Sequence, residues 1–442
     1  MIAWLAGIRT FASAFRSLRT RNYRLFWIGQ MISLAGTWMQ DVALSWLVLD
    51  LSKSPEALGL TMTIRFLPAL LFSLYGGVLA DRLRKRRTIM WCEGTQVIVA
   101  LALAVLTHTG VVTVMIIYVL AGVRGFIDAL EGPTRQAFVP EMVGTEDVPN
   151  AVALNSTLFN GARVVGPAIG AVVIGTLGMA ACFYLNTASF LAVLVALSAM
   201  RTRELHVTPR LPREGSVRQM WEALRFVRRS PELMVIFIVM AALGAFGLNF
   251  QTLLPLVTKY VLMADEVTLA LLTTTMGIGS VVTGLFVAYR GRPSQRLFLV
   301  SAAAFSLLLL GAGLSPWTPV TAVLLFGTGV SATLTMTSAN TRLQLGSPGD
   351  LRGRVMGMYI VVFIGTTPIG SYLIGVLAER VDMLATVLVI AGLCAIGVVA
   401  GAVSALRHRS EAERPTDGDR PNGGAVWRTG PPGAVEKTGG AA

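Results

Sequence analysis

The residues of this sequence most able to do chemistry are four charged side chains inside long apolar runs. Asp41 and Arg65 lie in two successive runs, and Arg124 and Asp128 lie four residues apart in a later one. A charge at the centre of a bilayer costs about 2.5–3.5 kcal/mol on insertion scales, so such groups face a cavity or a charged partner. A buried carboxylate beside an arginine could exchange a proton or recognise a cation.

The positions of these charges predict which of them meet. Asp41 lies in the second half of a predicted span over 24–49, and Arg65 lies in the first half of the next, antiparallel span over 57–80. Side chains at one depth on neighbouring helices can pair, so we expect contact between Asp41 and Arg65. Arg124 and Asp128 share one helix face. Both pairs are candidates for proton coupling, and the alternative for each is a static structural ion pair.

The apolar runs that carry these charges dominate the whole chain. Its 442 residues are 54% hydrophobic and only 14% charged, which is typical of a membrane protein. Each run is close to the 20 residues that a bilayer requires. We predict an all-α membrane protein with twelve spans, at 24–49, 57–80, 88–108, 111–131, 153–176, 179–199, 233–258, 267–289, 296–313, 318–340, 354–378 and 382–405.

The net charge of +13 could suggest nucleic-acid binding, but its distribution indicates a membrane orientation instead. Most Lys and Arg side chains fall in alternate loops and at the two chain ends. The opposite loops hold Lys53, Lys259 and Arg380. Basic loops stay on the cytoplasmic side, so we expect both termini in the cytoplasm, a lipid bilayer as the surroundings, and no nucleic-acid partner.

Motifs for hydrolytic or metal chemistry do not appear in the sequence. The three cysteines lie inside apolar runs, and the three histidines are far apart. There is no Walker-type Gly-Lys-Ser/Thr motif for ATP. We therefore predict a protein that is not an enzyme, holds no metal and needs no cofactor.

Hydropathy and charge divide the chain into five segments. In the basic loop near the middle, Met220, Trp221, Leu224 and Val227 form an apolar stripe at helical spacing, which is typical of a helix lying on the membrane surface. The predicted segments are a cytoplasmic interfacial helix over 1–22, an N-terminal six-helix bundle over 23–199, a cytoplasmic loop with an amphipathic helix over 200–232, a C-terminal six-helix bundle over 233–405 and a disordered cytoplasmic tail over 406–442.

The two bundles read as repeats of one another. Arg135, Gly166-Pro167 and Gly170 in the first are echoed by Arg342, Pro368 and Gly370 in the second. Parallel repeats of six spans place a substrate site between the halves near mid-depth. For this cavity we select polar and aromatic residues at that depth: Gln40, Asn249, Phe250, Gln251, Met336 and Asn340.

A charged hinge between the second and third spans carries a family resemblance. It resembles the major facilitator signature GxLaDRxGRRxxl, with matches at Gly77, Leu79, Asp81, Arg82, Lys85 and Ile89 and a departure at Arg84. Further motifs around Trp38, Arg135, Asn155 and Arg352 resemble one branch of that superfamily. This branch is that of the enterobactin exporter, also described as transmembrane secretion effectors.

The resemblance implies a conformational gate. In the superfamily the acid of this hinge contacts the start of the eleventh helix. The gate residues would then be Gly77, Asp81 and Arg82 on one side and Arg352 and Arg354 on the other. Glu93, which lies shallow in the third span, is expected to join Arg82, Arg86 or Arg163.

A second motif is similar to the antiporter signature GxxxGPxxGG. It contains Arg163, Gly166, Pro167 and Gly170, with Ala171 in place of the last glycine. Pro167 removes a backbone hydrogen bond, and the two glycines form a face for close helix packing. The resemblance implies a helix bend that seals the interface between the halves, and the alternative is ordinary glycine packing.

Composition and spacing predict only a multi-span, pseudo-repeated membrane protein, and the resemblance implies a secondary exporter of small amphipathic molecules such as drugs, siderophores or other natural products. The resemblance implies proton antiport by alternating access in a bacterial inner membrane. We expect it to work as a monomer with a small-molecule substrate and protons as its partners. The alternatives are a nutrient importer, or a membrane sensor or scaffold that keeps the fold without transporting.

Overall fold

The computed structural model describes residues 15–206, 217–290 and 294–412, and within them the chain forms helices and no strand. The first half contains η1 (Arg16–Arg19), α2 (Arg21–Ser52), α3 (Pro55–Arg82), α4 (Lys85–His108), α5 (Val114–Val143), α6 (Val148–Leu177) and α7 (Met179–Ser198). The connection holds η2 (Thr202–Glu204) and α8 (Val217–Arg229). The second half contains α9 (Pro231–Ala242), the π-helical η3 (Leu243–Gly247), α10 (Phe250–Tyr260), α11 (Glu266–Arg290), α12 (Gln295–Leu314), α13 (Thr318–Gly346), α14 (Gly349–Gly365), α15 (Thr367–Arg380) and α16 (Met383–Ala412).

Ten of the predicted spans are long and apolar enough to cross a membrane, with α14 and α15 counted as one. The fourth, α5, carries Arg124, Asp128 and Glu131, which lower its apolar character. The seventh consists of α9, η3 and α10, and it is interrupted by the π-helical turns before Asn249. Both exceptions are helices that hold buried polar groups, such as Arg124 and Asn249.

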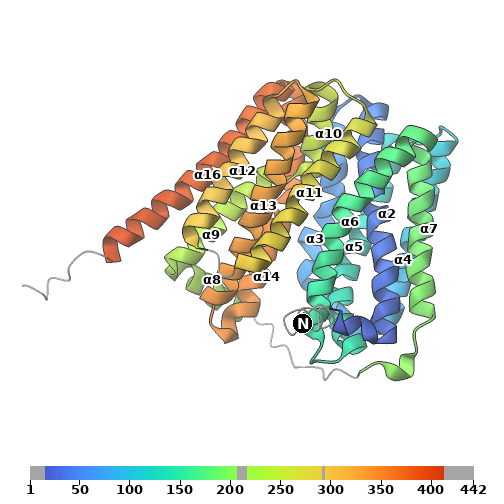
Figure 1. Ribbon diagram of the computed structural model, residues 1–442, viewed down its shortest axis with the longest axis horizontal. Coiled ribbons are helices and arrows are strands. Elements are labelled where there is room, and N and C mark those ends of the chain that lie inside the picture. Colours follow the sequence, from blue (N-terminus) through green and yellow to red (C-terminus); the bar gives the residue numbers. More distant parts are fainter. Residues whose placement is uncertain (1–14, 207–216, 291–293, 413–442) are drawn as a thin grey trace, which may run out of the picture.

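The two halves repeat the same packing order. In the first half α3 packs on α5, α4 on α7, and α2 on α7; in the second half α11 packs on α13, α12 on α16, and α9 on α16 (Figure 1). Across the interface α3 meets α15, and α6 meets α11. The prediction of two pseudo-repeated six-helix bundles is therefore confirmed.

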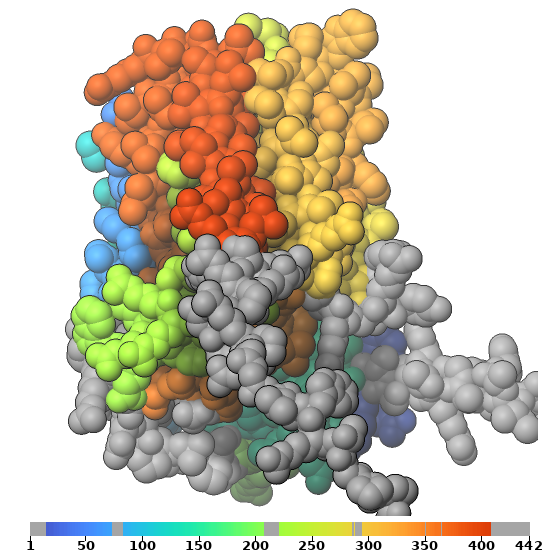
Figure 2. Space-filling view, turned by 90° about the vertical axis from the view of Figure 1, so that its left-hand side faces the viewer, coloured from blue at the N-terminus to red at the C-terminus, as the bar shows by residue number. Residues whose placement is uncertain are grey.

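Both described chain ends lie at the same end of the bundle (Figure 1). We refer to this end as the terminal face and to the opposite end, with the loops after Ser52, Tyr260 and Arg380, as the far face. In Figure 1 the two sets of helices meet at the far face and spread toward the terminal face. Figure 2 shows α16 along the outside of the second half, with α8 at its terminal-face end.

The described residues bear on three of the predicted segments. Most of the predicted helix over 1–22 lies outside the described residues, and its described part is only the short η1 before α2 begins at Arg21. The predicted tail begins too early, because α16 continues to Ala412. In α8, Ala223 and Val227 are buried while Trp221 is 61% exposed, so Trp221 does not share the buried face. The α8 helix meets the next helix at a bend of 104°, as a surface helix does.

Candidate functional site

Asp41 is the centre of a buried ion cluster in the first half. Its Oδ1 lies 2.8 Å from Arg124 Nη1 and 3.0 Å from Arg65 Nη1, and its Oδ2 accepts a hydrogen bond from Arg65 Nη2 at 3.0 Å. All three side chains are at most 6% exposed. The predicted contact between Asp41 and Arg65 is present. Two guanidinium groups therefore surround one carboxylate.

The cluster reaches into the second half through Gln251. Gln251 Nε2 donates to Asp41 Oδ2 at 3.2 Å, while Gln251 Oε1 is buried without a hydrogen-bond partner. Gln251 lies at the start of α10, just after the break in the seventh span. Asp41 therefore has ion-pair or hydrogen-bond partners in both halves.

Arg124 and Asp128 form a long ion pair along one helix face, as their spacing predicts. Arg124 Nε and Asp128 Oδ2 are 3.9 Å apart, and Arg124 makes a shorter contact of 2.8 Å with Asp41. Asp128 is 42% exposed and accepts a hydrogen bond from Gln96 at 3.0 Å. The link from Arg124 to Asp41 was missed because it depends on which way α5 faces α2, which spacing along one helix does not give.

Arg163 lies between aromatic rings from both halves. Its guanidinium carbon is 5.7 Å from the ring centre of Trp38 on α2 and 5.8 Å from that of Phe250 on α10. Its Nε is buried without a hydrogen-bond partner. No carboxylate among the described residues pairs with it, which distinguishes it from Arg65 and Arg124.

The glycines of the antiporter-like motif bring α6 close to α2. A Cβ atom on Gly166 would lie 2.5 Å from the Ala35 carbonyl oxygen and 2.6 Å from Trp38 Cβ, and one on Gly170 would touch Met39. The α6 helix continues through Pro167 to Leu177. The motif thus sets the distance between the helix that carries Arg163 and the helix that carries Trp38 and Asp41.

Several other predicted cavity residues serve helix packing. Gln40 accepts a hydrogen bond from Asn186 of α7 at 2.8 Å, which places it inside the first half. Asn249 donates to the Gly244 and Ala245 carbonyls and accepts from Ser371, so it satisfies the backbone at the helix break. The contacts of these two polar groups lie within one half, and a role for either residue in the cavity stays a prediction.

The remaining two cavity candidates lie on α13. Met336 packs against the hydrophobic core, and Asn340 accepts a hydrogen bond from Gln344 one turn further along. Neither is bonded to Asp41 or to Arg163.

The predicted gate lies partly outside the described residues. The surroundings of Gly77 and the side chains of Asp81 and Arg82 are not among the described parts of the chain, so the contact of these residues with α14 stays a prediction. On the other side, Arg352 is exposed and Arg354 lies 3.8 Å from Glu222 of α8.

A second buried charge cluster lies nearer the terminal face. Glu93 pairs with Arg135 at 3.3 Å and accepts a hydrogen bond from Gln30, and Arg135 also pairs with Glu131. Glu93 therefore pairs with Arg135 and not with Arg86 or Arg163, while a contact with Arg82, whose side chain lies outside the described residues, stays a prediction. The signal that could have found this cluster is the four-residue spacing of Glu131 and Arg135 on α5.

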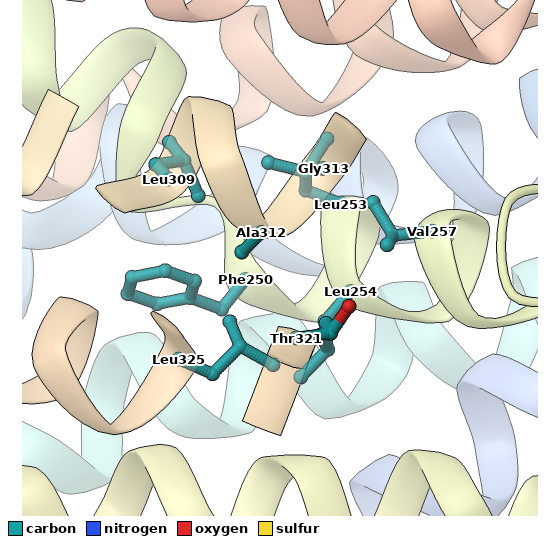
Figure 3. Close-up of a pocket in the computed structure, with 9 residues that line it drawn as sticks. All are labelled: Phe250, Leu253, Leu254, Val257, Leu309, Ala312, Gly313, Thr321 and Leu325. Carbon is teal, nitrogen blue, oxygen red and sulfur yellow. The ribbon is translucent and has the colours of Figure 1, made fainter. Parts of the chain in front are cut away.

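A small apolar pocket lies within the second half, between α10, α12 and α13 (Figure 3). Thr321 provides the one hydroxyl among its nine lining residues. Phe250 belongs both to this pocket and to the surroundings of Arg163. The remaining lining residues are Leu253, Leu254, Val257, Leu309, Ala312, Gly313 and Leu325.

At the far face the halves are joined by hydrogen bonds to helix ends. Glu379 of α15 accepts from the Ser54 hydroxyl at 2.7 Å and from the Glu56 backbone N–H at 3.4 Å, at the start of α3. Lys259 donates to the Leu49 carbonyl at 2.9 Å, near the end of α2. These contacts hold the far face together.

Comparisons with known proteins agree over most of the chain. The model of the family described as transmembrane secretion effector matches residues 12–422. The multidrug efflux pump Tap of Mycolicibacterium fortuitum is 28% identical, over 86% of this chain and 95% of its own length. The staphyloferrin A transporter of Staphylococcus aureus is 25% identical, over 80% and 89%. The enterobactin exporter EntS of Salmonella choleraesuis is 26% identical, over 85% and 91%.

Solved structures show a likeness in fold. A bacterial homologue of the human lysosomal transporter Spinster, in an inward-facing and occupied conformation, has a TM-score of 0.70 at 11% identity, covering 90% of this chain and 99% of its own. The nucleoside transporter NupG has a TM-score of 0.64 at 14% identity, covering 87% and 98%.

Proposed function

Because the chain belongs to the transmembrane secretion effectors of the major facilitator superfamily, we propose that it exports small amphipathic molecules across a bacterial inner membrane in exchange for protons. That it is a small-molecule transporter follows from the family. Its direction, its proton coupling and a cytoplasmic terminal face are our proposal. The efflux pump and the enterobactin exporter among its relatives support export.

The observation that carries the proton coupling is the position of Asp41. This carboxylate is buried, it neutralises two arginines of the first half, and it accepts a hydrogen bond from Gln251 of the second half. A movement that separates α10 from α2 would break the Gln251 contact. Binding of a proton would remove the charge that Arg65 and Arg124 share, so protonation and the arrangement of the halves are linked.

The conformation fits one step of such a cycle. The far face is joined by Glu379 and Lys259, and the Asp41 carboxylate contacts two guanidinium groups. This combination corresponds to the state that has released its proton toward the terminal face and is ready for substrate from the cytoplasm. Opening of the far face would separate Gln251 from Asp41 and expose the carboxylate to the more acidic side.

Transport by purified protein in inside-out proteoliposomes tests the proposal. With an acidic lumen, we expect uptake of at least one compound from a panel of ethidium, enterobactin and staphyloferrin A, and loss of this uptake when the gradient is collapsed. Asp41→Asn should abolish gradient-driven uptake and leave exchange without a gradient measurable. Glu204→Gln is the control, since Glu204 is exposed in the loop after α7 and pairs with Arg201 three residues before it. Gradient-driven uptake by Asp41→Asn at the wild-type rate would refute the role of Asp41.

A further inference from the structure

We propose that Arg163, between Trp38 and Phe250, is the substrate-binding group for an organic anion that carries an aromatic ring. This inference rests on the proposed transport function and names its substrate class. The anionic group of the substrate would accept hydrogen bonds from the guanidinium, and its ring would lie against the neighbouring aromatic side chains.

The first reason is that the positive charge of Arg163 has no carboxylate partner among the described residues and its Nε–H has no acceptor. Arg163 is half-buried, and its Nε is fully buried with no hydrogen-bond acceptor. A buried charged donor is costly unless an acceptor satisfies it. Arg65 and Arg124 have Asp41, whereas Arg163 has two aromatic faces and no carboxylate among the described residues. Aromatic faces stabilise the cation but accept none of its in-plane N–H groups. A planar carboxylate supplies the acceptors that are missing.

The second reason is the place of Arg163 at the seam of the two halves. Trp38 comes from the first half and Phe250 from the second. A Cβ atom on Gly277 of α11 would lie 3.0 Å from the Arg163 carbonyl oxygen, so α6 and α11 touch at this level. A ligand bound here would contact both halves, so its contacts would change when the halves move.

The third reason is that Arg163 adjoins the Asp41 cluster. Trp38 and Asp41 are three residues apart on one face of α2, and Phe250 precedes Gln251 in the chain. A ligand at Arg163 would therefore act on the helices that hold Asp41.

The charges of the surrounding side chains indicate whether the ligand is an anion or a cation. Arg65 and Arg124 share the carboxylate of Asp41, and Asp128 lies 3.9 Å from Arg124, whereas no carboxylate among the described residues pairs with Arg163. The unbalanced positive charge of this region therefore lies on Arg163. The aromatic faces that could cage a cationic drug are covered by Arg163 itself. Both features favour an anionic ligand.

Three probes with one naphthalene ring test the charge preference. Equilibrium binding to the detergent-purified full chain is measured for naphthalene-2-carboxylate, naphthalene-2-carboxamide and 2-naphthylmethylammonium. We expect wild type to bind the carboxylate at least tenfold more tightly than the ammonium, with an affinity that falls as salt is raised. Equal or tighter binding of the ammonium by wild type would overturn the proposal without any variant.

Variants then assign the preference to Arg163. Arg163→Gln should weaken carboxylate binding at least tenfold and leave carboxamide binding unchanged, and Arg163→Lys should restore part of the loss. Arg380→Gln, an exposed arginine at the far end of α15, is the matched control and should bind as wild type does. Unchanged carboxylate binding in Arg163→Gln would show that Arg163 only packs the interface.

The same probes separate this inference from the proposed transport function. If ethidium moves under a proton gradient while the carboxylate does not bind, the exporter stands and the anion site is wrong. If the carboxylate binds through Arg163 while no compound moves under a gradient, the site stands and proton-coupled export is wrong.

Discussion

Asp41 is the shared ion-pair partner of two guanidinium groups. The effect of a substitution on stability therefore depends on whether it leaves a buried charge unpaired. Asp41→Asn leaves Arg65 with no described counter-charge, whereas Arg65→Gln leaves a balanced pair of Asp41 and Arg124. Removing one partner of a buried ion pair costs about 3–5 kcal/mol because the other charge remains buried. We expect Asp41→Asn to melt well below Arg65→Gln in a thermal shift measurement in detergent.

A double variant checks the reason. Asp41→Asn combined with Arg65→Gln should melt above Asp41→Asn alone, because it removes the unpaired charge. Additive losses in the double variant would mean that Arg65 has another role in stability, such as its contact with the ring of Phe66.

From the sequence, the contacts of these residues could be predicted only from the depth of each residue within its span. Antiparallel spans at one depth were enough to pair Asp41 with Arg65. Gln40 and Gln251 show what depth leaves out: each was selected as polar and near mid-depth, yet Gln40 bonds to α7 and Gln251 bonds to Asp41. Successive residues on a helix point about 100° apart, so the side that a residue faces depends on helix packing.

At the scale of elements, α6 offers two glycines with opposite expectations. Gly166→Ala would place a Cβ within 2.6 Å of α2 atoms, and overpacking of this kind costs about 1–3 kcal/mol. A Cβ added at Gly161 would meet nothing within 4 Å, so Gly161→Ala should be neutral or slightly stabilising. Melting temperatures of the two variants test this difference, and equal values would show that α6 and α2 move apart easily.

The start of α11 provides a prediction about pH. Asp265 accepts hydrogen bonds from the Thr268 backbone N–H at 2.9 Å and from its hydroxyl at 2.7 Å, and these bonds lower the pKa of the Asp265 carboxyl. A lowered folded-state pKa gives stability that is present above the unfolded pKa of about 3.9 and is lost as the pH falls through the folded value.

We therefore expect Asp265→Ala to weaken the first turn of α11 by about 1 kcal/mol at pH 7 and by less near pH 3. Hydrogen exchange of that turn, compared between wild type and variant at each pH, measures the difference. Asp265→Asn is the control, because it keeps the cap without the titratable group. A difference that stays constant with pH would rule out the carboxylate as its source.

The elements themselves could largely be predicted from hydropathy, and their interruptions could not. The span over 233–258 reads as one apolar run, yet η3 and Asn249 break it and turn Phe250 and Gln251 toward the first half. This break depends on tertiary partners such as Ser371 of α15, which lie more than a hundred residues away in sequence.

At the scale of the whole molecule, closure of the far face combines weak charges with one close helix contact. Exposed charges at helix ends contribute about 0.3–1 kcal/mol each, so Glu379 alone does not lock this face. The helix contact is tighter: a Cβ on Gly375 of α15 would lie 2.8 Å from the Pro55 carbonyl oxygen and 3.0 Å from Gly59 Cα of α3. Only glycine lets α3 and α15 approach this closely.

Gly375→Ala should therefore shift the population toward a conformation open at the far face. Spin labels on Val111→Cys and Trp317→Cys, which are 56% and 70% exposed in far-face loops of the two halves, report the separation by pulsed electron resonance. The buried cysteines Cys92, Cys182 and Cys394 are first replaced by alanine. We expect a longer mean distance in Gly375→Ala than in Gly392→Ala, the control, whose added Cβ meets nothing within 4 Å. If both variants give the wild-type distance, the glycine contact does not set the closed state, and the weak charges at the helix ends must together hold this face.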